Sequence, residues 1–278
     1  MNLRTDIDML QSSRITDSHE LLSSIAGLMW EASDVIMAVY QQDDFGETVK
    51  SDKSPVTEAD LAGHHVLIHG LALLTPEIPV VSEEDAESVT IGRERSCYWL
   101  IDPLDGTKEF INRNDEFTCN LALIENHRPT LGFVSIPAQE LLYIGGPGYH
   151  SNRIHRSGQT VSLFPESQPG LTRVVASKSH LNDETRAFID GIPGKIELVQ
   201  AGSSLKLVKI AEGLADIYPR LGPTCEWDTA AAHAVVLGVG GTVTDLNDAE
   251  LVYGKDNILN PFFVVRAPHY QHSSIENQ

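Results

Sequence analysis

The clearest chemical signal in this chain is a pair of carboxylates at the end of an apolar run. Asp102 and Asp105 follow residues 99–101, which have the apolar, β-branched character of a buried strand. Pro103 lacks a backbone N–H and is expected to end that strand, which leaves the Leu104 carbonyl free as a further oxygen ligand. Carboxylate and carbonyl oxygens are the ligands that Mg²⁺ prefers. The spacing therefore predicts a divalent-cation site.

The turn after these carboxylates is suited to a phosphate group. Gly106 and Thr107 offer backbone N–H groups and a hydroxyl where a helix is expected to begin. Two Asp residues with this spacing are also common in ordinary turns. The prediction of a metal and phosphate site therefore depends on the other acidic residues.

Three more acidic clusters occur at expected ends of strands or helices. Asp60 lies where an extended Ser-Pro segment turns into a helix, Glu83 and Glu84 follow a short β-branched run, and Asp228 opens an alanine-rich helix. Each cluster alone is more typical of a solvated turn or a helix N-cap than of a metal site. Their occurrence together favours one shared site.

The four clusters, in this order, resemble the Mg²⁺-dependent, lithium-sensitive phosphatase family that includes inositol monophosphatase. The motifs that carry the resemblance are Asp60, Glu83-Glu84, Asp102-Pro-Leu-Asp-Gly-Thr107 and Trp227-Asp228. Within that family, the chain resembles the bacterial 3'(2'),5'-bisphosphate nucleotidases of the CysQ type through residues 105–110, 202–206, 218–220 and 259–261. The resemblance runs from about Ser18 to about Pro268. Ala232 departs from it, because the family usually has glycine there, but this change removes no ligand.

The resemblance implies a phosphomonoesterase that removes the 3'-phosphate of adenosine 3',5'-bisphosphate and releases AMP and phosphate. It also implies activity on 3'-phosphoadenylyl sulfate and a role in sulfur assimilation or nucleotide turnover. One alternative is an inositol or fructose-bisphosphate phosphatase with the same metals and a different leaving-group pocket. The other is a non-catalytic, Mg²⁺-dependent regulatory protein.

The resemblance also implies a set of ligands for two or three Mg²⁺ ions. Glu83, Asp102 and the Leu104 carbonyl are expected to hold the first ion. Asp102 is expected to bridge to a second ion, which Asp105 and Asp228 complete. Two or three such ions would reverse the local charge, so that a phosphate could approach the acidic cluster.

Catalytic and substrate-binding roles follow from the same resemblance. Thr107, Asp60 and Glu83 are expected to orient and deprotonate the attacking water. The expected substrate contacts are Glu83, Leu104, Asp105, Gly106, Thr107, His180, Ser203, Lys206, Arg220 and Asp228. For His180 a capping or turn role is an equal alternative. For Ser203 and Lys206 the alternative is an ordinary serine N-cap with a solvated lysine.

Composition limits the possible partners and location. The formal net charge of −19 disfavours nucleic acids and anionic membranes, and leaves a small phosphorylated nucleotide as the expected partner. No apolar run reaches the ~20 residues of a membrane helix, and no signal peptide is visible. Three widely spaced cysteines indicate reduced thiols. We expect a cytoplasmic protein; peripheral association with the cytoplasmic face of the inner membrane is an alternative from the resemblance, and nothing in the sequence specifies an oligomeric state.

Hydrophobic periodicity predicts layers of the α+β or α/β kind, and we expect a layered α+β fold. Asp17 and Glu20 form an expected capping box for a helix that runs to about residue 40. A helix or a turn is expected at 107–112, and the other expected helices are 58–74, 182–190, 203–213 and 228–238. The expected strands are 79–82, 97–102, 117–124, 130–136, 140–144, 172–176, 196–200, 215–218, 241–245 and 262–266.

The expected units are an N-terminal extension (1–17), an α+β half with most metal ligands (18–165), an α/β half that completes the site (171–268) and a tail (269–278). The Pro/Gly/Ser-rich run 164–170 marks the boundary between the halves. The family resemblance makes the fold specific, since it implies αβαβα layers with the active site between the halves.

Overall fold

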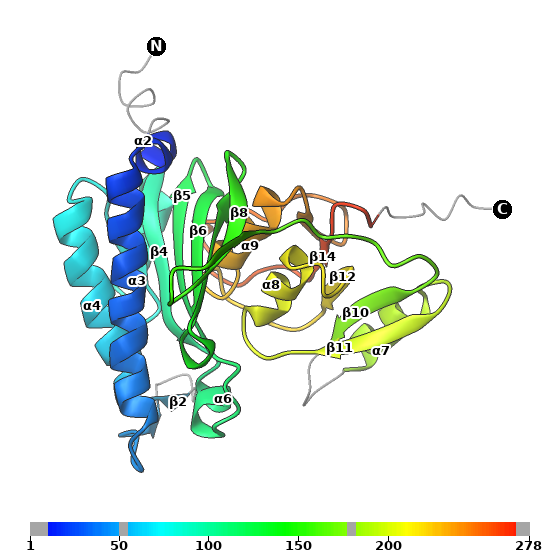
Figure 1. Ribbon diagram of the computed structural model, residues 1–278, viewed down its shortest axis with the longest axis horizontal. Helices are drawn as coiled ribbons and strands as arrows, with labels where there is room; N and C mark the ends of the chain where they lie inside the picture. The colour runs from blue at the N-terminus through cyan, green and yellow to red at the C-terminus, as the bar shows by residue number, and fades with distance from the viewer. Residues whose placement is uncertain (1–10, 50–54, 177–181, 271–278) are drawn as a thin grey trace.

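The computed structural model describes residues 11–49, 55–176 and 182–270, which form two β-sheets separated and flanked by helices (Figure 1). The larger sheet has seven strands in the order β3-β4-β5-β6-β7-β8-β9. Their bounds are β3 Val80–Ser82, β4 Cys97–Asp105, β5 Thr118–Glu125, β6 Arg128–Ile136, β7 Leu141–Gly146, β8 Tyr149–His155 and β9 Thr160–Ser162. β3 pairs with β4 in parallel, and the other neighbours pair antiparallel.

The smaller sheet has five strands in the order β11-β10-β12-β14-β13. Their bounds are β10 Thr172–Ala176, β11 Ile196–Gln200, β12 Ile217–Arg220, β13 Thr242–Asp245 and β14 Phe263–Arg266. β10 is parallel to β11 and β12, whereas β14 is antiparallel to β12 and β13. A separate pair is formed by β1 Thr48–Val49 and β2 Pro55–Val56.

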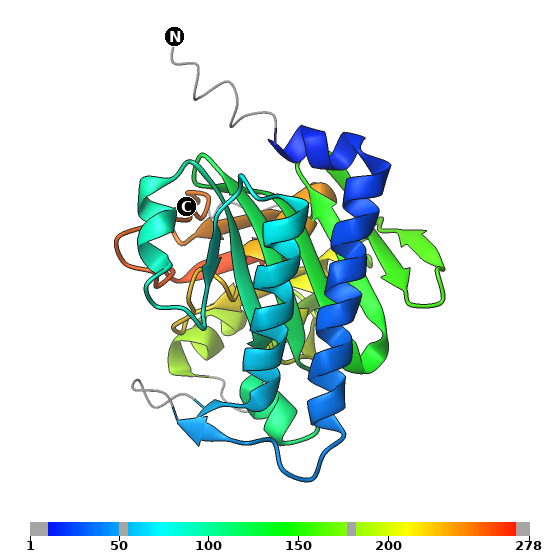
Figure 2. The same ribbon diagram turned by 90° about the vertical axis from the view of Figure 1, so that its left-hand side faces the viewer.

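The helices occupy three layers around these sheets. α3 His19–Tyr40 and α4 Glu58–Leu74 lie side by side on the outer face of the larger sheet (Figure 2). α8 Leu205–Ala211 and α9 Ala230–Gly238 pack between the sheets, and α7 Asp183–Asp190 packs on the smaller sheet. The expected αβαβα layering is therefore confirmed.

The shorter helices lie at the ends of these layers. They are α2 Gln11–Asp17, α5 Val89–Glu94, α6 Thr107–Ile111 and the 3₁₀ turn η1 Pro137–Gln139. The N-terminal extension had no predicted structure, yet α2 forms there and buries Ile15 completely. Because α2 includes Asp17, the expected capping box at Asp17 is wrong. Ser18 is the N-cap of α3, and its hydroxyl accepts a hydrogen bond from Leu21 N.

Alternation along β4 determines which way its carboxylate points. Trp99 and Ile101 are fully buried in the core formed with α3 and α4, whereas Leu100 belongs to the core formed with α9. Asp102 continues the series of Leu100, so it faces the middle layer where α9 begins. The strand thus points its carboxylate toward the second half of the chain.

Helix α3 has the length and apolar composition that could cross a membrane, and no other helix of the described residues passes that test. In the structure its apolar side packs against the larger sheet and α4. The apolar composition of α3 is therefore used in the protein core.

Candidate active site

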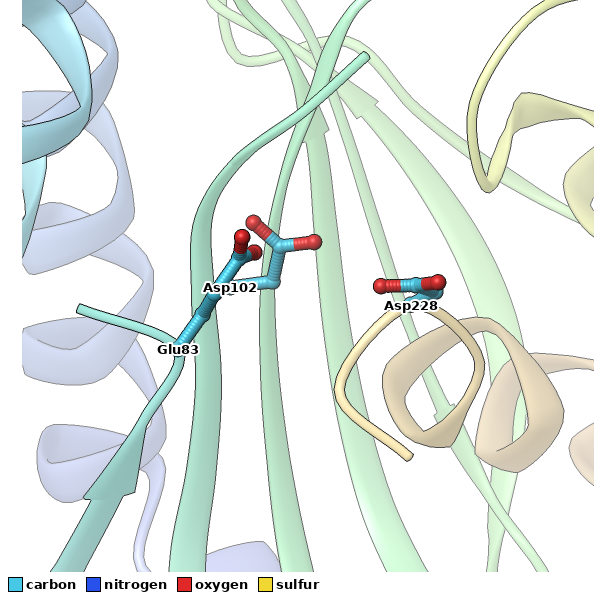
Figure 3. A group of neighbouring side chains, drawn as sticks. All are labelled: Glu83, Asp102 and Asp228. Carbon is cyan, nitrogen blue, oxygen red and sulfur yellow. The ribbon is translucent and has the colours of Figure 1, made fainter. Parts of the chain in front are cut away.

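Three carboxylates from distant parts of the chain converge between the two sheets (Figure 3). Glu83 follows β3, Asp102 lies in β4 and Asp228 precedes α9. One oxygen of each lies within 4.8 Å of one oxygen of the others. Parallel pairing of β3 with β4 brings Glu83 beside Asp102, whose side chain is only 1% exposed. The structure therefore brings together three of the expected metal ligands.

The chain bends directly after Asp102, but the strand does not end there. β4 shifts its register between Asp102 and Asp105 and pairs again through Asp105 and Thr118. The prediction that Pro103 ends the strand is therefore wrong, because the loss of one N–H is accommodated by a bulge. Inside the bulge, Leu104 N donates to Asp102 Oδ1 at 3.1 Å, which fixes that carboxylate.

The Gly-Thr turn begins helix α6, as the sequence predicts. Gly106 is the N-cap and has a φ of 93°, a left-handed conformation that glycine adopts at little cost. Thr107 Oγ1 lies 3.4 Å from the Leu104 carbonyl oxygen, which is a long hydrogen bond within the turn. The turn places the Leu104 carbonyl and the Thr107 hydroxyl side by side.

Asp60 and Thr107 come into contact although they are on different elements. Thr107 Oγ1 donates toward Asp60 Oδ1 at 3.4 Å. The other oxygen, Asp60 Oδ2, accepts from Thr57 N and Thr57 Oγ1, both at 2.7 Å, within a capping box at the start of α4. The capping box fixes the Asp60 carboxylate with one oxygen directed at Thr107.

Asp105 is held by the second half of the chain. Its Oδ2 accepts a hydrogen bond from Ser204 N, just before α8. The Ser204 hydroxyl lies 2.7 Å from Thr118 Oγ1 and donates to Asn120 Oδ1 at 2.8 Å. Ser204 therefore joins the smaller-sheet half to β5 and to the end of β4.

Burial and mutual repulsion raise the pKa values of Asp102 and Asp228. Burial is the largest cause for both, followed for Asp102 by the charge of Glu83 and for Asp228 by the charge of Asp105. The pKa of Asp102 lies well above its ordinary value, and that of Asp228 is raised to about 8. Burial raises the pKa of Asp105 only to about 6, because Lys206 and the Ser204 N–H stabilise its charge.

A cavity of about 720 Å³ opens beside the carboxylates. Six expected substrate contacts line it, namely Asp105, Gly106, Ser203, Lys206, Arg220 and Asp228. Glu83, Leu104 and Thr107, also expected contacts, are not among its lining residues. His180 lies outside the described residues. The cavity therefore has acidic groups and three cationic side chains, Lys108, Lys206 and Arg220, on its walls.

The Ser203–Lys206 segment does not have the geometry of a simple capped helix. Ser203 has a φ of 42°, and its hydroxyl donates to the Glu116 carbonyl at 2.9 Å. Ser204 occupies the N-cap position without a side-chain cap. Lys206 Nζ donates to the Ser203 carbonyl at 2.9 Å and is half-buried. The alternative of a serine cap with a solvated lysine is therefore wrong.

Several residues of the site region were not predicted. The cavity is also lined by Lys108 and Asn112, on or next to α6, and by Asn182 and Thr185, on or next to α7. Asn120 is 1% exposed in a strand whose other side chains are mostly apolar. A buried amide in an apolar strand requires hydrogen-bond partners, and this was the available signal for Asn120.

Residues 17–271 match the Inositol monophosphatase family. The chain is 42% identical over 247 residues to the 3'(2'),5'-bisphosphate nucleotidase CysQ of Salmonella typhimurium, and the alignment covers 88% of this chain and 99% of that protein. It is 41% identical to the protein of the same name from Escherichia coli K12, with the same coverage.

Solved structures have the same fold. The crystal structure of CysQ from Bacteroides thetaiotaomicron superposes with a TM-score of 0.79 at 33% identity, over 91% of this chain and 99% of that one. Inositol monophosphatase II from Staphylococcus aureus superposes with a TM-score of 0.69 at 20% identity, over 90% and 89% of the two chains. At 20% identity, the similarity to the Staphylococcus aureus protein supports a shared fold only.

Proposed function

The chain belongs to the inositol monophosphatase family, and on that premise we propose that it is a 3'(2'),5'-bisphosphate nucleotidase. The proposed reaction is removal of the 3'-phosphate of adenosine 3',5'-bisphosphate, which yields AMP and phosphate. The observation that carries the proposal is the carboxylate cluster of Glu83, Asp102 and Asp228 beside a cavity with Lys206 and Arg220 on its wall. The similarity to two CysQ proteins along nearly their whole length supports the same reaction.

The donor set fits Mg²⁺. The cluster consists of carboxylate oxygens, the ligands of hard divalent cations. The raised pKa values of Asp102 and Asp228 reflect buried negative charge without enough positive charge nearby. Glu83, Asp102, Asp105, Asp228 and the Leu104 carbonyl would hold the ions. When bound, Mg²⁺ supplies Lewis acidity and offsets the repulsion between this site and a phosphate.

The protein's own groups have separate tasks in the proposed reaction. The Thr107 hydroxyl, oriented by its contact with Asp60, would hold the attacking water and pass its proton toward Asp60 or Glu83. The backbone N–H groups at Gly106 and Thr107 would hold the phosphate in line for attack.

Lys206 and Arg220 are proposed to bind the remainder of the nucleotide. Both line the cavity, and Arg220 Nη2 is anchored on the Pro223 carbonyl at 2.9 Å. Their charges also offset part of the rise that burial causes in the pKa of the adjacent carboxylates. Lys206 acts on Asp105 in this way, and Arg220 acts on Asp228. Cations at this place favour a substrate with a second phosphate or a sulfate. Activity on 3'-phosphoadenylyl sulfate, a role in sulfur assimilation and a cytoplasmic location belong to the same proposal.

A comparison of substrates tests the proposed function. Phosphate release would be measured side by side on adenosine 3',5'-bisphosphate, 3'-phosphoadenylyl sulfate, inositol phosphate and fructose bisphosphate, with Mg²⁺ and with a chelator. We expect the highest kcat/KM on the adenosine bisphosphate and no turnover with the chelator. A preference for inositol phosphate or fructose bisphosphate would support the alternative phosphatases, and no turnover on any substrate would support a non-catalytic protein.

A further inference from the structure

The segment that carries Asp228 depends on neighbouring residues for its position. Residues 224–229 form no helix or strand of their own before α9 begins. Within the segment, Cys225 N donates to Asp228 Oδ2 at 2.9 Å, and the Glu226 carbonyl accepts from Thr229 N and Ala230 N. Whatever anchors this segment therefore determines where the Asp228 carboxylate lies.

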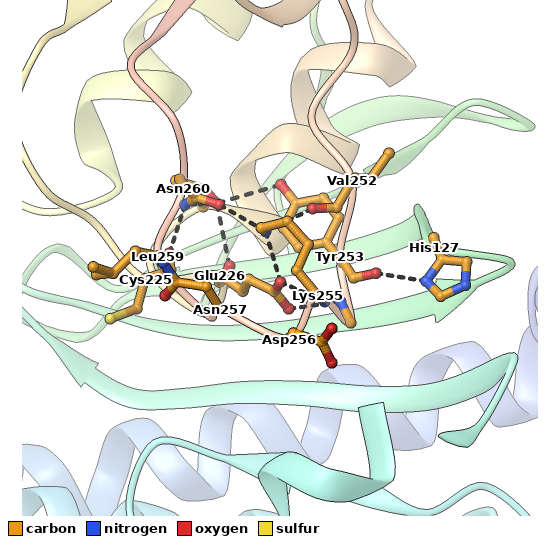
Figure 4. Close-up of polar contacts among 12 residues, drawn as sticks. His127, Cys225, Glu226, Val252, Tyr253, Lys255, Asp256, Asn257, Leu259 and Asn260 are labelled. Carbon is orange, nitrogen blue, oxygen red and sulfur yellow. Dashed lines mark hydrogen bonds and ion pairs between the residues drawn. The ribbon is translucent and has the colours of Figure 1, made fainter. Parts of the chain in front are cut away.

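A second loop, residues 253–260, runs beside the segment and pairs with it (Figure 4). Cys225 and Leu259 form an isolated antiparallel bridge. Glu226 N donates to the Ile258 carbonyl at 2.9 Å, and Asn260 N donates to the Thr224 carbonyl at 2.8 Å. The two loops thus align their backbones without belonging to either large sheet.

The side chain of Asn260 connects three points around Asp228. Its Nδ2 donates to the Cys225 carbonyl at 2.7 Å, to Thr229 Oγ1 at 3.1 Å and to Thr224 Oγ1 at 3.2 Å. Asn260 is 8% exposed, so water competes little for these contacts. One amide group therefore contacts the chain on both sides of Asp228, at Thr224 and Cys225 before it and at Thr229 after it.

Glu226 anchors the same segment through a buried charge. Its carboxylate is 4% exposed and accepts from Gly254 N at 2.7 Å, Lys255 N at 3.0 Å and Lys255 Nζ at 2.6 Å. Gly254 has a φ of +75°, and a Cβ there would lie 2.2 Å from the Gly92 carbonyl, so only glycine fits this turn. Glu226, although next to the cluster in sequence, is thus directed away from it.

Lys255 links the two anchors. Its Nζ, besides the Glu226 carboxylate, contacts the Val252 carbonyl at 2.8 Å and Asn260 Oδ1 at 3.5 Å. The ammonium group neutralises the buried Glu226 charge and orients the Asn260 amide so that Nδ2 faces the Asp228 segment. Asn260, Lys255 and Glu226 form one hydrogen-bonded unit, which we call the Asn260 clamp.

We propose that the Asn260 clamp is a positioning device for Asp228, which sets the affinity of the site for Mg²⁺ without touching metal or substrate. This inference rests on the proposed function, in which Asp228 is a Mg²⁺ ligand. Without the clamp the 224–229 segment can move. Part of the free energy of Mg²⁺ binding must then be used to order Asp228, so the affinity for Mg²⁺ falls. Removal of groups that orient metal ligands typically costs about 10- to 100-fold in metal affinity or activity.

The test measures the Mg²⁺ concentration for half-maximal activity and, separately, the concentration of Mg²⁺ alone that raises the Tm. We expect Asn260→Ala to raise both midpoints by about 10- to 100-fold while kcat at saturating Mg²⁺ changes far less. Lys255→Met should act in the same direction, and Lys255→Arg, which keeps the charge, should restore part of the loss. The Lys255 pair keeps the test informative if Asn260→Ala does not fold.

Glu212→Gln is the matched control. Glu212 also forms a polar unit, which is half-buried, with Tyr143 at 2.8 Å and Arg153 at 2.9 Å, and it lies at the opposite end of α8 from Ser204. The Glu212→Gln substitution should lower the Tm and leave both Mg²⁺ midpoints unchanged. Equal shifts in Glu212→Gln and Asn260→Ala would overturn the proposal, because general destabilisation would then explain both.

Asp228→Asn separates this inference from the proposed function. If Asp228→Asn raises the Mg²⁺ midpoints and the clamp variants do not, the positioning proposal fails and the metal site stands. If Asp228→Asn leaves them unchanged, the assignment of Asp228 as a ligand fails, and the clamp proposal fails with it.

Discussion

The backbone N–H of Ser204 donates a hydrogen bond to the Asp105 carboxylate, and this contact joins the end of β4 to the segment before α8 beside the carboxylate cluster. Asp105 is the last residue of β4, and Ser204 directly precedes α8 between the sheets. A movement of one half relative to the other would therefore displace Asp105. The geometry of the site depends on both halves, although Glu83, Asp102 and Asp105 all come from the first.

Asp105→Asn tests the role of this carboxylate in turnover. The substitution keeps an oxygen for Ser204 N but removes the charge that would complete the second metal site. We expect at least ~10²-fold lower kcat, the scale of losing one preorganised electrostatic contact, with no loss of Tm. Asp34→Asn, at an exposed residue paired with Arg156, is the control. Near-normal turnover of Asp105→Asn at saturating Mg²⁺ would remove Asp105 from the site.

The stability of the metal-free protein should fall as the pH rises from about 4 to about 8. Burial raises the pKa of Asp228 from 3.8 to about 8 and that of Asp105 to about 6. In this window the folded protein retains protons that the unfolded chain has released, so its free energy of unfolding decreases with pH. Mg²⁺ takes the place of those protons. The Mg²⁺-induced rise in Tm should therefore be larger at about pH 8 than at about pH 5.

His233 acts in the opposite direction and must be separated from the cluster. Burial lowers its pKa from 6.5 to about 3, which removes stability as the pH falls. This contribution is common to the metal-free and the Mg²⁺-bound protein. Calorimetric Tm values with chelator and with Mg²⁺ therefore isolate the cluster by their difference. A difference that does not change with pH would contradict the assigned pKa shifts.

The sequence predicted the layered fold because the long elements bury periodic apolar faces. α4 Glu58–Leu74 has the predicted bounds, and the long helix α3 differs only at its start. The missed elements are short or polar. β8 Tyr149–His155 buries only Ser151 fully, so it shows no alternation, and α5 Val89–Glu94 buries only Gly92. Their formation depends on tertiary contacts that local patterns do not encode.

The site was predictable where acidic motifs resemble those of a known family. Glu83, Asp102 and Asp228 occur in acidic motifs at element ends and were expected as ligands through that resemblance, and the structure brings them together. The Asn260 clamp was not predicted in this role, because its contacts join residues about 30 positions apart. Contacts between residues so far apart in the sequence depend on how the two loops pack, and the spacing of residue types does not predict this packing.

Lys206→Ala should separate substrate choice from chemistry. A charge-assisted contact to a second phosphate is worth roughly 1.5–3 kcal/mol, or about 10- to 150-fold in kcat/KM. We expect that loss on adenosine 3',5'-bisphosphate and little loss on adenosine 3'-monophosphate. Lys209→Ala, on the same helix, is the matched control. Equal losses on both substrates would place Lys206 at the reacting phosphate, in keeping with its effect on Asp105.

Li⁺ should inhibit the enzyme, because a monovalent ion in the carboxylate cluster would stabilise the departing oxygen or bound phosphate poorly. We expect uncompetitive or mixed inhibition with respect to substrate. Initial rates across millimolar Li⁺ at limiting Mg²⁺ measure this effect. Unchanged rates would remove the support that the metal-site assignment draws from the family.

The identity of the product tests the central claim most directly. Adenosine 3',5'-bisphosphate would be incubated with the wild-type protein in Mg²⁺ or in excess chelator, and the products separated by chromatography and identified by ³¹P NMR. The account predicts adenosine 5'-monophosphate and inorganic phosphate in Mg²⁺, and intact substrate with the chelator. Release of the 5'-phosphate, the same turnover in chelator, or intact substrate in Mg²⁺ would contradict it.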